Sequence, residues 1–317
     1  GEVGPIRAWA RGAFESCRKL ALMVVGGMFY HGEKHLALRR NRGTWLTDCP
    51  RVRLQRPFLL VPGLNGKPAR FQLLTDHLTR DGLNGGRTYY LKQGEIFHDA
   101  VCSQPVPRGA KDSEARIFLQ IASEGELPPN RAALEVRDNL AAIRRFTGTR
   151  TVDVEGHSMG GLSVRVYLDQ FGWGVGKFLM VGTPNRGTSL AEVASWAVEN
   201  QYKVAMAIGG LSSHALPALQ WLRPEASNPD LRALNQRWAH QRARVEDARI
   251  VGTCDLPTLC GDVFGEGDGK VAVVDLPLPG VEVKVLGGRL SKHHGLQMHD
   301  SDVFREGVDF FGWEKAS

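Results

Sequence analysis

The residues with the clearest chemical potential are Gly156-His157-Ser158-Met159-Gly160, between a β-rich run and an amphipathic helical run that ends at Phe171. A serine on a tight strand-to-helix turn exposes its hydroxyl above the sheet edge, and the crowded turn needs very small residues two positions before and after it. Ser158 would also begin a helix, where backbone amides favour developing negative charge. The pattern therefore predicts a nucleophilic serine; the alternative is a glycine-rich turn with a solvent-facing serine.

This motif resembles the nucleophile elbow of the α/β-hydrolase family, specifically of bacterial lipases and carboxylesterases. Two further segments carry the resemblance, VGTPNRGTSLA at 181–191 and GEGDGKV at 265–271, so that it covers residues 55–311. It implies a mostly parallel central sheet with helices on both faces and a helical cap or lid. It also implies a triad in the chain order serine, acid, histidine.

The acid of such a triad orients the base that takes the proton of the serine. Asp268 stands in a Gly-Asp-Gly turn after a predicted strand, where this chain order places the acid. Asp255, Asp262 and Glu266 lie in the same region and remain as other candidates. The alternative for Asp268 is a surface Asx turn.

The base is ambiguous, because three histidines stand between the last predicted strand and the last helix. The His-x-Gly-Leu pattern of the family fits His293. Counting back from a helix with Asp300 as N-cap favours His294 instead. His299 loosely resembles a tail seen in some lipases. We expect His293 or His294, in that order, ahead of His299; for each, the alternative is a solvated loop histidine.

Two backbone amides are expected to form the oxyanion hole of the resembled family. One belongs to Met159, which follows the nucleophile. The other belongs to Leu64, in the loop after the first core strand, where Pro62-Gly63 replaces the His-Gly of many relatives. The change matters little for the amide of Leu64, because the backbone donates the hydrogen bond. The alternative is an ordinary turn between a strand and a helix.

Residues 187–223 are rich in apolar side chains and resemble a lipase cap. Such a cap gives an acyl chain a dry groove and keeps water away from the intermediate. The walls predicted to bind substrate are Trp196, Met206, Leu211 and Trp221. The alternative is that these residues only pack the cap onto the core.

The elements that must position these residues alternate short β-rich runs with amphipathic helical runs, the pattern of a parallel sheet covered on both faces. We expect an N-terminal helical extension over 1–50 and an α/β-hydrolase domain over 51–317, with a cap or lid insertion at about 187–240. Residues 93–128 are irregular and are interpreted as an excursion from the core. Strands are predicted at 57–62, 87–91, 151–155, 177–181, 248–252 and 281–286.

Composition excludes several other classes of protein. Hydrophobic residues make up 42% of the 317 residues, so the chain can bury a large core and is not a disordered or low-complexity protein. The formal net charge of +6 permits attraction to anionic lipid without requiring it. No basic run interleaved with aromatic residues occurs, so no nucleic-acid partner is expected. Five cysteines without a Cys-x-x-Cys pair exclude zinc-ribbon and thioredoxin sites; a disulfide between Cys254 and Cys260 stays open.

The most apolar stretch, residues 20–30, follows Arg18 and Lys19. It is too short to span a bilayer, and no A-x-A cleavage site follows its basic flank. We interpret residues 5–30 as a helix that docks on the body, with contact to a membrane surface as the alternative. A secreted, periplasmic or membrane-associated location is favoured over a cytoplasmic one.

The leading interpretation is a serine ester hydrolase that cleaves lipid or acyl esters through an acyl-enzyme on Ser158. This chemistry needs no metal and no organic cofactor. A phospholipase, a thioesterase or an acyltransferase would use the same groups. A different class is a non-catalytic hydrolase-fold scaffold that binds a lipid or a protein, because a fold does not determine function.

Overall fold

The computed structural model describes residues 5–40, 46–287 and 292–316, and its centre is an eight-stranded sheet. Neighbouring strands pair in parallel except at one edge, where β3 and β4 are antiparallel. The sheet order is β11 (Glu282–Leu286), β8 (Asp247–Thr253), β7 (Val175–Val181), β6 (Val152–His157), β2 (Phe58–Val61), β5 (Ile117–Gln120), β3 (Thr88–Lys92) and β4 (Glu95–Phe97). The mostly parallel sheet predicted from the sequence is therefore confirmed.

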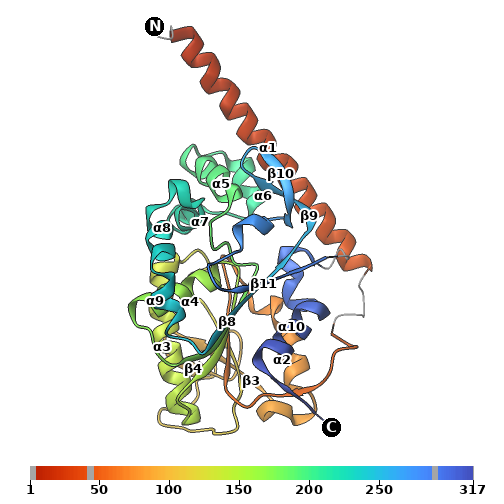
Figure 1. Cartoon of the computed structure of the whole chain (residues 1–317), viewed down its shortest axis with the longest axis vertical. Helices are drawn as coiled ribbons and strands as arrows, with labels where there is room; N and C mark the ends of the chain where they lie inside the picture. The colour runs from red at the N-terminus through yellow and green to blue at the C-terminus, as the bar shows by residue number, and fades with distance from the viewer. Residues whose placement is uncertain (1–4, 41–45, 288–291, 317) are drawn as a thin grey trace.

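Helices cover both faces of this sheet, as Figure 1 shows. One face carries α3 (Pro129–Thr147) and α4 (Met159–Gln170), and the other carries α2 (Gln72–Thr79) and α10 (Ser301–Phe311). Along β2, Leu59 and Val61 belong to the core under α3 and α4, whereas Phe58 and Leu60 belong to the core under α2 and α10. Successive side chains point to opposite faces, so a strand buried on both faces reads as a continuous apolar run.

The segment 93–128 corrects the prediction of an excursion from the core. It contains β4 and β5, and β5 pairs with both β2 and β3 inside the sheet. The four residues of β5 are all buried. Because a short strand buried on both faces lacks the alternation that marks a half-exposed strand, it was not recognised among the surrounding polar residues.

The chain between β7 and β8 forms a helical cap whose helices run from Ser189 to Arg242, whereas the insertion was expected at about 187–240. Its helices are α5 (Ser189–Glu199), α6 (Lys203–Gly209), α7 (Leu216–Leu222), α8 (Pro229–Gln236) and α9 (Trp238–Arg242). A separate hairpin follows β8, formed by β9 (Asp255–Cys260) and β10 (Val263–Asp268). This hairpin was not predicted, and it ends at Asp268. The cysteines, including Cys254 and Cys260, are free.

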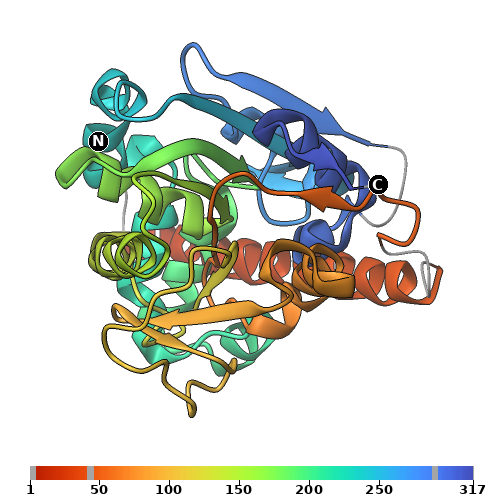
Figure 2. The same ribbon diagram turned by 90° about the horizontal axis from the view of Figure 1, so that it is seen from below.

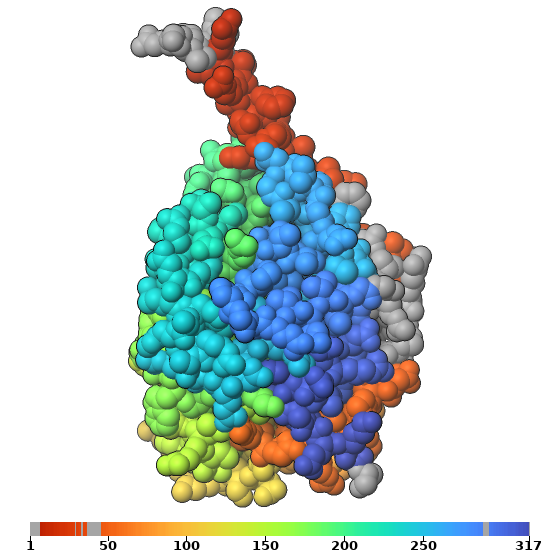
Figure 3. All heavy atoms as spheres, in the orientation of Figure 1, coloured from red at the N-terminus to blue at the C-terminus, as the bar shows by residue number. Residues whose placement is uncertain are grey.

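The N-terminal segment is one long helix, α1 (Pro5–Arg40), which extends ten residues beyond the predicted 5–30. Its later part lies along the body and contacts α5, α6 and β9 (Figures 1 and 2). Its first turns stand clear of the body, as the space-filling view shows (Figure 3). In the part of the chain that is described, no helix has both the length and the apolar content needed to cross a bilayer.

Candidate active site

Ser158 occupies a strained turn between β6 and α4. Its backbone has φ 55° and ψ −131°, a conformation that costs energy for any residue with a side chain. The glycines on either side of Ser158 are required because there is no room for a side chain at these positions. A Cβ at Gly156 would lie 2.6 Å from the Cα of Gly161, and a Cβ at Gly160 would overlap the carbonyl oxygen of Val61. The local sequence therefore forces the Ser158 hydroxyl out of the crowded turn.

A continuous hydrogen-bonded chain joins Ser158, His294 and Asp268. Nε2 of His294 lies 2.9 Å from Oγ of Ser158, and its Nδ1 lies 2.7 Å from Oδ2 of Asp268. Both His294 and Asp268 are buried. This is the geometry in which a histidine can take the serine proton while a carboxylate holds the ring.

Asp268 is positioned by several donors besides His294. Its Oδ1 accepts hydrogen bonds from the backbone amides of Lys270 (2.9 Å) and Val271 (2.8 Å), which close the turn after β10. Burial alone would raise the pKa of Asp268, but the neighbouring His294 and these amides lower it below its usual value. Asp268 therefore stays ionised beside the histidine.

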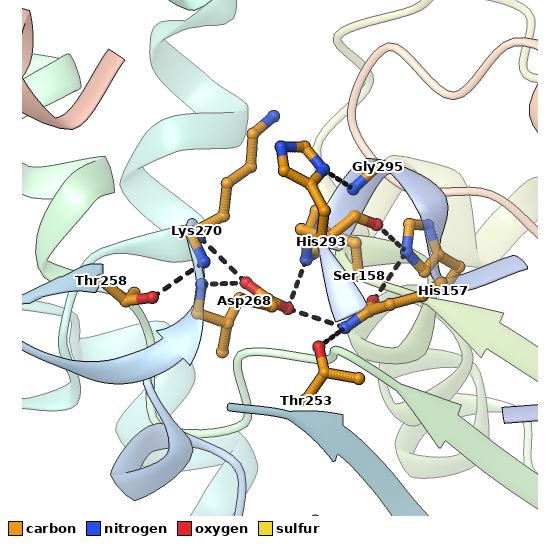
Figure 4. A network of polar contacts seen from close by, with 12 residues as sticks. His157, Ser158, Thr253, Thr258, Asp268, Lys270, His293 and Gly295 are labelled. Carbon is orange, nitrogen blue, oxygen red and sulfur yellow. Dashed lines mark hydrogen bonds and ion pairs between the residues drawn. The ribbon is translucent and has the colours of Figure 1, made fainter. Parts of the chain in front are cut away.

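Three buried residues with no role in the predicted site, Gln297, Thr253 and His157, hold this arrangement together, as Figure 4 shows in part. The amide nitrogen of Gln297 donates to Oδ2 of Asp268 (2.9 Å) and to Oγ1 of Thr253 (2.8 Å). Nε2 of His157 lies 3.1 Å from both the side-chain oxygen of Gln297 and the carbonyl oxygen of His294. Burial lowers the pKa of His157 to about 3, so its ring is neutral and donates through Nε2.

The structure corrects the preference for His293 as the base. Its Nδ1 accepts a hydrogen bond from the amide of Gly295 (3.0 Å), which caps the 3-10 helix His294–His299. Its Nε2 donates to the carbonyl oxygen of Tyr30 in α1 (2.8 Å). Burial lowers the pKa of His293 to about 3. His299 forms a hydrogen bond with the backbone of Arg70. Of the three histidines, only His294 hydrogen-bonds to Ser158.

The two expected oxyanion amides lie close to the serine. Leu64 lines the cavity above Ser158, and Gly63 packs so tightly that an added Cβ would lie 2.9 Å from the amide nitrogen of Met159. In residues 46–287, no acceptor takes a hydrogen bond from the amides of Leu64 or Met159. Both are therefore free to donate to a bound oxygen.

A cavity of about 510 Å³ opens beside Ser158 and His294, a volume typical of small-molecule sites. Of the four predicted substrate-binding residues, only Leu211 lines it. Trp196, Met206 and Trp221 instead pack against the core, and the ring of Trp196 stacks on Tyr202 at 4.8 Å. The apolar cap residues that do line the cavity are Leu190, Ala191, Ala194, Ala207, Ile208, Leu211, Leu219 and Leu222.

One wall of this cavity comes from α1, which the sequence predicts to be an extension outside the hydrolase domain. Met23, Gly27 and Tyr30 face the cavity. A Cβ at Gly27 would overlap Ile208 of α6, so the glycine allows the two helices to approach closely. Arg18 forms an ion pair with Asp262 of the β9–β10 hairpin. The helix is thus part of the site, and Asp262, a minor candidate for the acid, binds α1 instead.

Metal ligation is not evident at this site. Among the described residues, no group of three or more His, Cys, Asp or Glu side chains could hold a metal ion. Asp255 and Glu266, the remaining acid candidates, lie in β9 and β10. Neither hydrogen-bonds to His294, whose Nδ1 partner is Asp268.

Comparison with known proteins identifies the fold. No family model and no curated protein matches the chain. The mature form of the lipase BlEst2 from Bacillus licheniformis matches with a TM-score of 0.56 and 16% sequence identity, over 81% of this chain and 91% of that chain. A Listeria innocua protein, the product of the gene lin2722, matches with a TM-score of 0.54 and 14% identity, over 83% of this chain and 96% of that chain. The predicted α/β-hydrolase fold is confirmed.

Proposed function

We propose that this chain is a serine hydrolase that cleaves lipid or acyl esters through an acyl-enzyme on Ser158. The observation that carries the proposal is the unbroken contact from Ser158 through His294 to Asp268, at 2.9 and 2.7 Å, beside a cavity with apolar walls. A scaffold without catalysis has no need of a strained serine and a buried carboxylate aligned on one histidine.

The chemistry follows from these positions. Oγ of Ser158 attacks the ester carbonyl carbon while Nε2 of His294 takes its proton, and the ionised Asp268 stabilises the imidazolium that forms. The amides of Met159 and Leu64 donate to the developing oxyanion. His294 then gives the proton to the leaving alkoxide, and a water molecule releases the acid by the same steps.

The apolar cap favours an acyl chain as the group bound next to the serine. Leu190, Ala194 and Leu222 offer hydrocarbon surface in the cavity, and burying one CH₂ group contributes about 0.8 kcal/mol. The fold is also that of a protein described as a lipase from Bacillus licheniformis. An acyltransferase or a thioesterase would use the same acyl-enzyme and differs only in the acceptor or leaving group.

Labelling with a fluorophosphonate probe, together with turnover of p-nitrophenyl esters, tests this function. Wild-type protein should be labelled, whereas Ser158→Ala should lose labelling and lose turnover by on the order of 10⁶-fold. Ser103→Ala is a matched control, because Ser103 lies in an exposed loop hydrogen-bonded to Asp99. Labelling that survives in Ser158→Ala would show that another residue is the nucleophile.

We also propose that α1 contacts a membrane surface. Trp9 and Phe14, in the first three turns of α1, are 75% and 67% exposed. Val24 and Met28 continue the exposed apolar surface along the docked part. Together with Val25, these side chains form the outer stripe of α1. A helix with exposed apolar side chains and basic neighbours binds anionic lipid interfaces.

A further inference from the structure

Four cationic side chains line the same cavity as Ser158. They come from three separate segments: α1, the loop after β2 with its 3-10 helix Pro68–Arg70, and the turn after β10. This cationic wall consists of Lys34, Lys67, Arg70 and Lys270. Since the segments are far apart in sequence, only the fold brings the charges together.

The cationic wall has no counter-charge of its own. Within the described residues, no carboxylate forms an ion pair with any of its four members. Burial and the nearby Arg70 lower the pKa of Lys34, and the same two causes lower the pKa of Lys270 to about 8. Asp268 only partly offsets this, because His294, Gln297 and two amides already use its oxygens. Like charges in a partly buried cavity repel each other, and a bound anion would relieve the repulsion.

Lys270 is directed away from the triad. Figure 4 shows its side chain extending away from the carboxylate of Asp268, and its Nζ lies 4.8 Å from the centre of the Tyr30 ring. Tyr30 in turn packs against His293, with ring centres 4.1 Å apart and the ring planes tilted by 39°. The ammonium group is thus held at the cavity wall formed by α1, next to the residue that precedes the base.

The residues of α1 that line the cavity follow one another along the helix axis from an apolar to a cationic side chain. Met23 is buried in the apolar core that includes the cap helices, Tyr30 touches the loop of His293 and His294, and Lys34 follows one turn later. With a rise of 1.5 Å per residue, Met23 and Lys34 are about 16 Å apart and Tyr30 and Lys34 about 6 Å apart along the helix. The triad therefore lies between an apolar end and a cationic end.

We propose that the cationic wall binds a phosphodiester attached to the alcohol side of the scissile ester and repels a cationic head group beyond it, so that the preferred substrates are acyl esters of anionic glycerophospholipids. The inference rests on the proposed ester hydrolysis at Ser158. The acyl chain occupies the apolar end of the cavity, and the glycerol unit lies between Ser158 and the cationic wall. Arg70 supplies planar donors that match two phosphate oxygens, and the lysines supply point charges.

The test compares three soluble substrates of equal acyl length: dihexanoyl phosphatidylglycerol, dihexanoyl phosphatidylcholine and p-nitrophenyl hexanoate. Wild-type protein should prefer the anionic lipid over the zwitterionic one. Lys34→Gln and Arg70→Gln should each lower kcat/KM for the anionic lipid, relative to p-nitrophenyl hexanoate, by about tenfold. Arg70→Lys should recover part of this ratio. Lys111→Gln removes an exposed charge outside the cavity and should leave the ratio unchanged.

A binding measurement separates this inference from the proposed hydrolysis. Ser158→Ala protein should bind dihexanoyl phosphatidylglycerol in calorimetry, and adding Arg70→Gln should weaken that binding by about tenfold. Binding that depends on Arg70 without wild-type turnover would contradict the hydrolysis and retain the anion site. Turnover of p-nitrophenyl hexanoate with equal kcat/KM for both phospholipids, unaltered in Lys34→Gln and Arg70→Gln, would overturn the anion site and retain the hydrolysis.

Discussion

His293 donates a hydrogen bond from Nε2 to the backbone carbonyl oxygen of Tyr30, at 2.8 Å. This bond ties α1 to the residue immediately before the triad histidine. The ring of Tyr30 also packs on that of His293, and a Cβ at Gly295 would lie 3.0 Å from the Tyr30 hydroxyl oxygen. The N-terminal helix, which carries Trp9 on its outer stripe, is thereby connected to the loop that carries His294.

The two adjacent histidines should behave differently on substitution. We expect His294→Ala to lower kcat/KM on p-nitrophenyl esters by about three or more orders of magnitude, because the serine loses its base. His293→Ala should cost far less in rate, since its ring contacts Tyr30 and Gly295 rather than Ser158. Steady-state kinetics with thermal melts of both variants measure this difference. A larger loss in His293→Ala, without unfolding, would contradict the assignment.

The acyl groove should make longer chains better substrates. We expect turnover of p-nitrophenyl octanoate to exceed that of the acetate, because each buried CH₂ contributes about 0.8 kcal/mol. Ala194→Phe fills the cavity and should lower the octanoate-to-acetate ratio of kcat/KM by tenfold or more. Trp196→Phe is the matched control, because Trp196 packs on Tyr202 outside the cavity. A strict preference for acetate in wild-type protein would contradict the acyl groove and indicate a short-chain esterase instead.

The outer stripe of α1 should control attachment to anionic vesicles. Trp9→Ser and Phe14→Ser should each reduce flotation with phosphatidylglycerol vesicles, because each removes a large exposed apolar side chain. Raising salt should weaken attachment further, through screening over about 8–10 Å. Trp173→Ser is the control, since Trp173 is 62% exposed but lies far along the chain, after α4. Equal flotation of all three variants would exclude α1 as the contact.

Glu155 should make stability depend on pH. Burial raises the pKa of Glu155 to about 8, above the usual value for glutamate, so the folded state holds a proton that the unfolded state releases. Between about pH 4.5 and pH 8 the contribution of Glu155 to the free energy of unfolding should therefore fall as pH rises, by several kcal/mol at most. Glu155→Gln, which stays neutral, should lack this contribution, so that its stability relative to wild-type protein rises with pH over this range. Thermal melts of both proteins across this range measure it, and identical slopes would disprove it.

Local sequence was enough to predict the strand-to-helix turn at Ser158 and the sheet around it. Ser158 lies in a contiguous strand, turn and helix, so the crowding that requires Gly156 and Gly160 is already present in the order of residues. The alternating helices and apolar strands predicted a parallel sheet for the same reason. The strand β5 escaped prediction because its four residues carry no periodic signal, and its place depends on pairing with β2 and β3.

Tertiary structure decided what depends on contacts between distant segments. Adjacent histidines differ only in which way each side chain points, and that is set by Asp268, Tyr30 and Gly295 rather than by spacing. An apolar helix at the N-terminus was evident from the sequence, but its docking beside the cap brings α1 into the cavity wall. The sequence by itself determined the turn at Ser158 and the fold class, because local sterics and periodicity depend on neighbouring residues. The choice of His294, the cavity and its cationic wall arise only when remote segments meet.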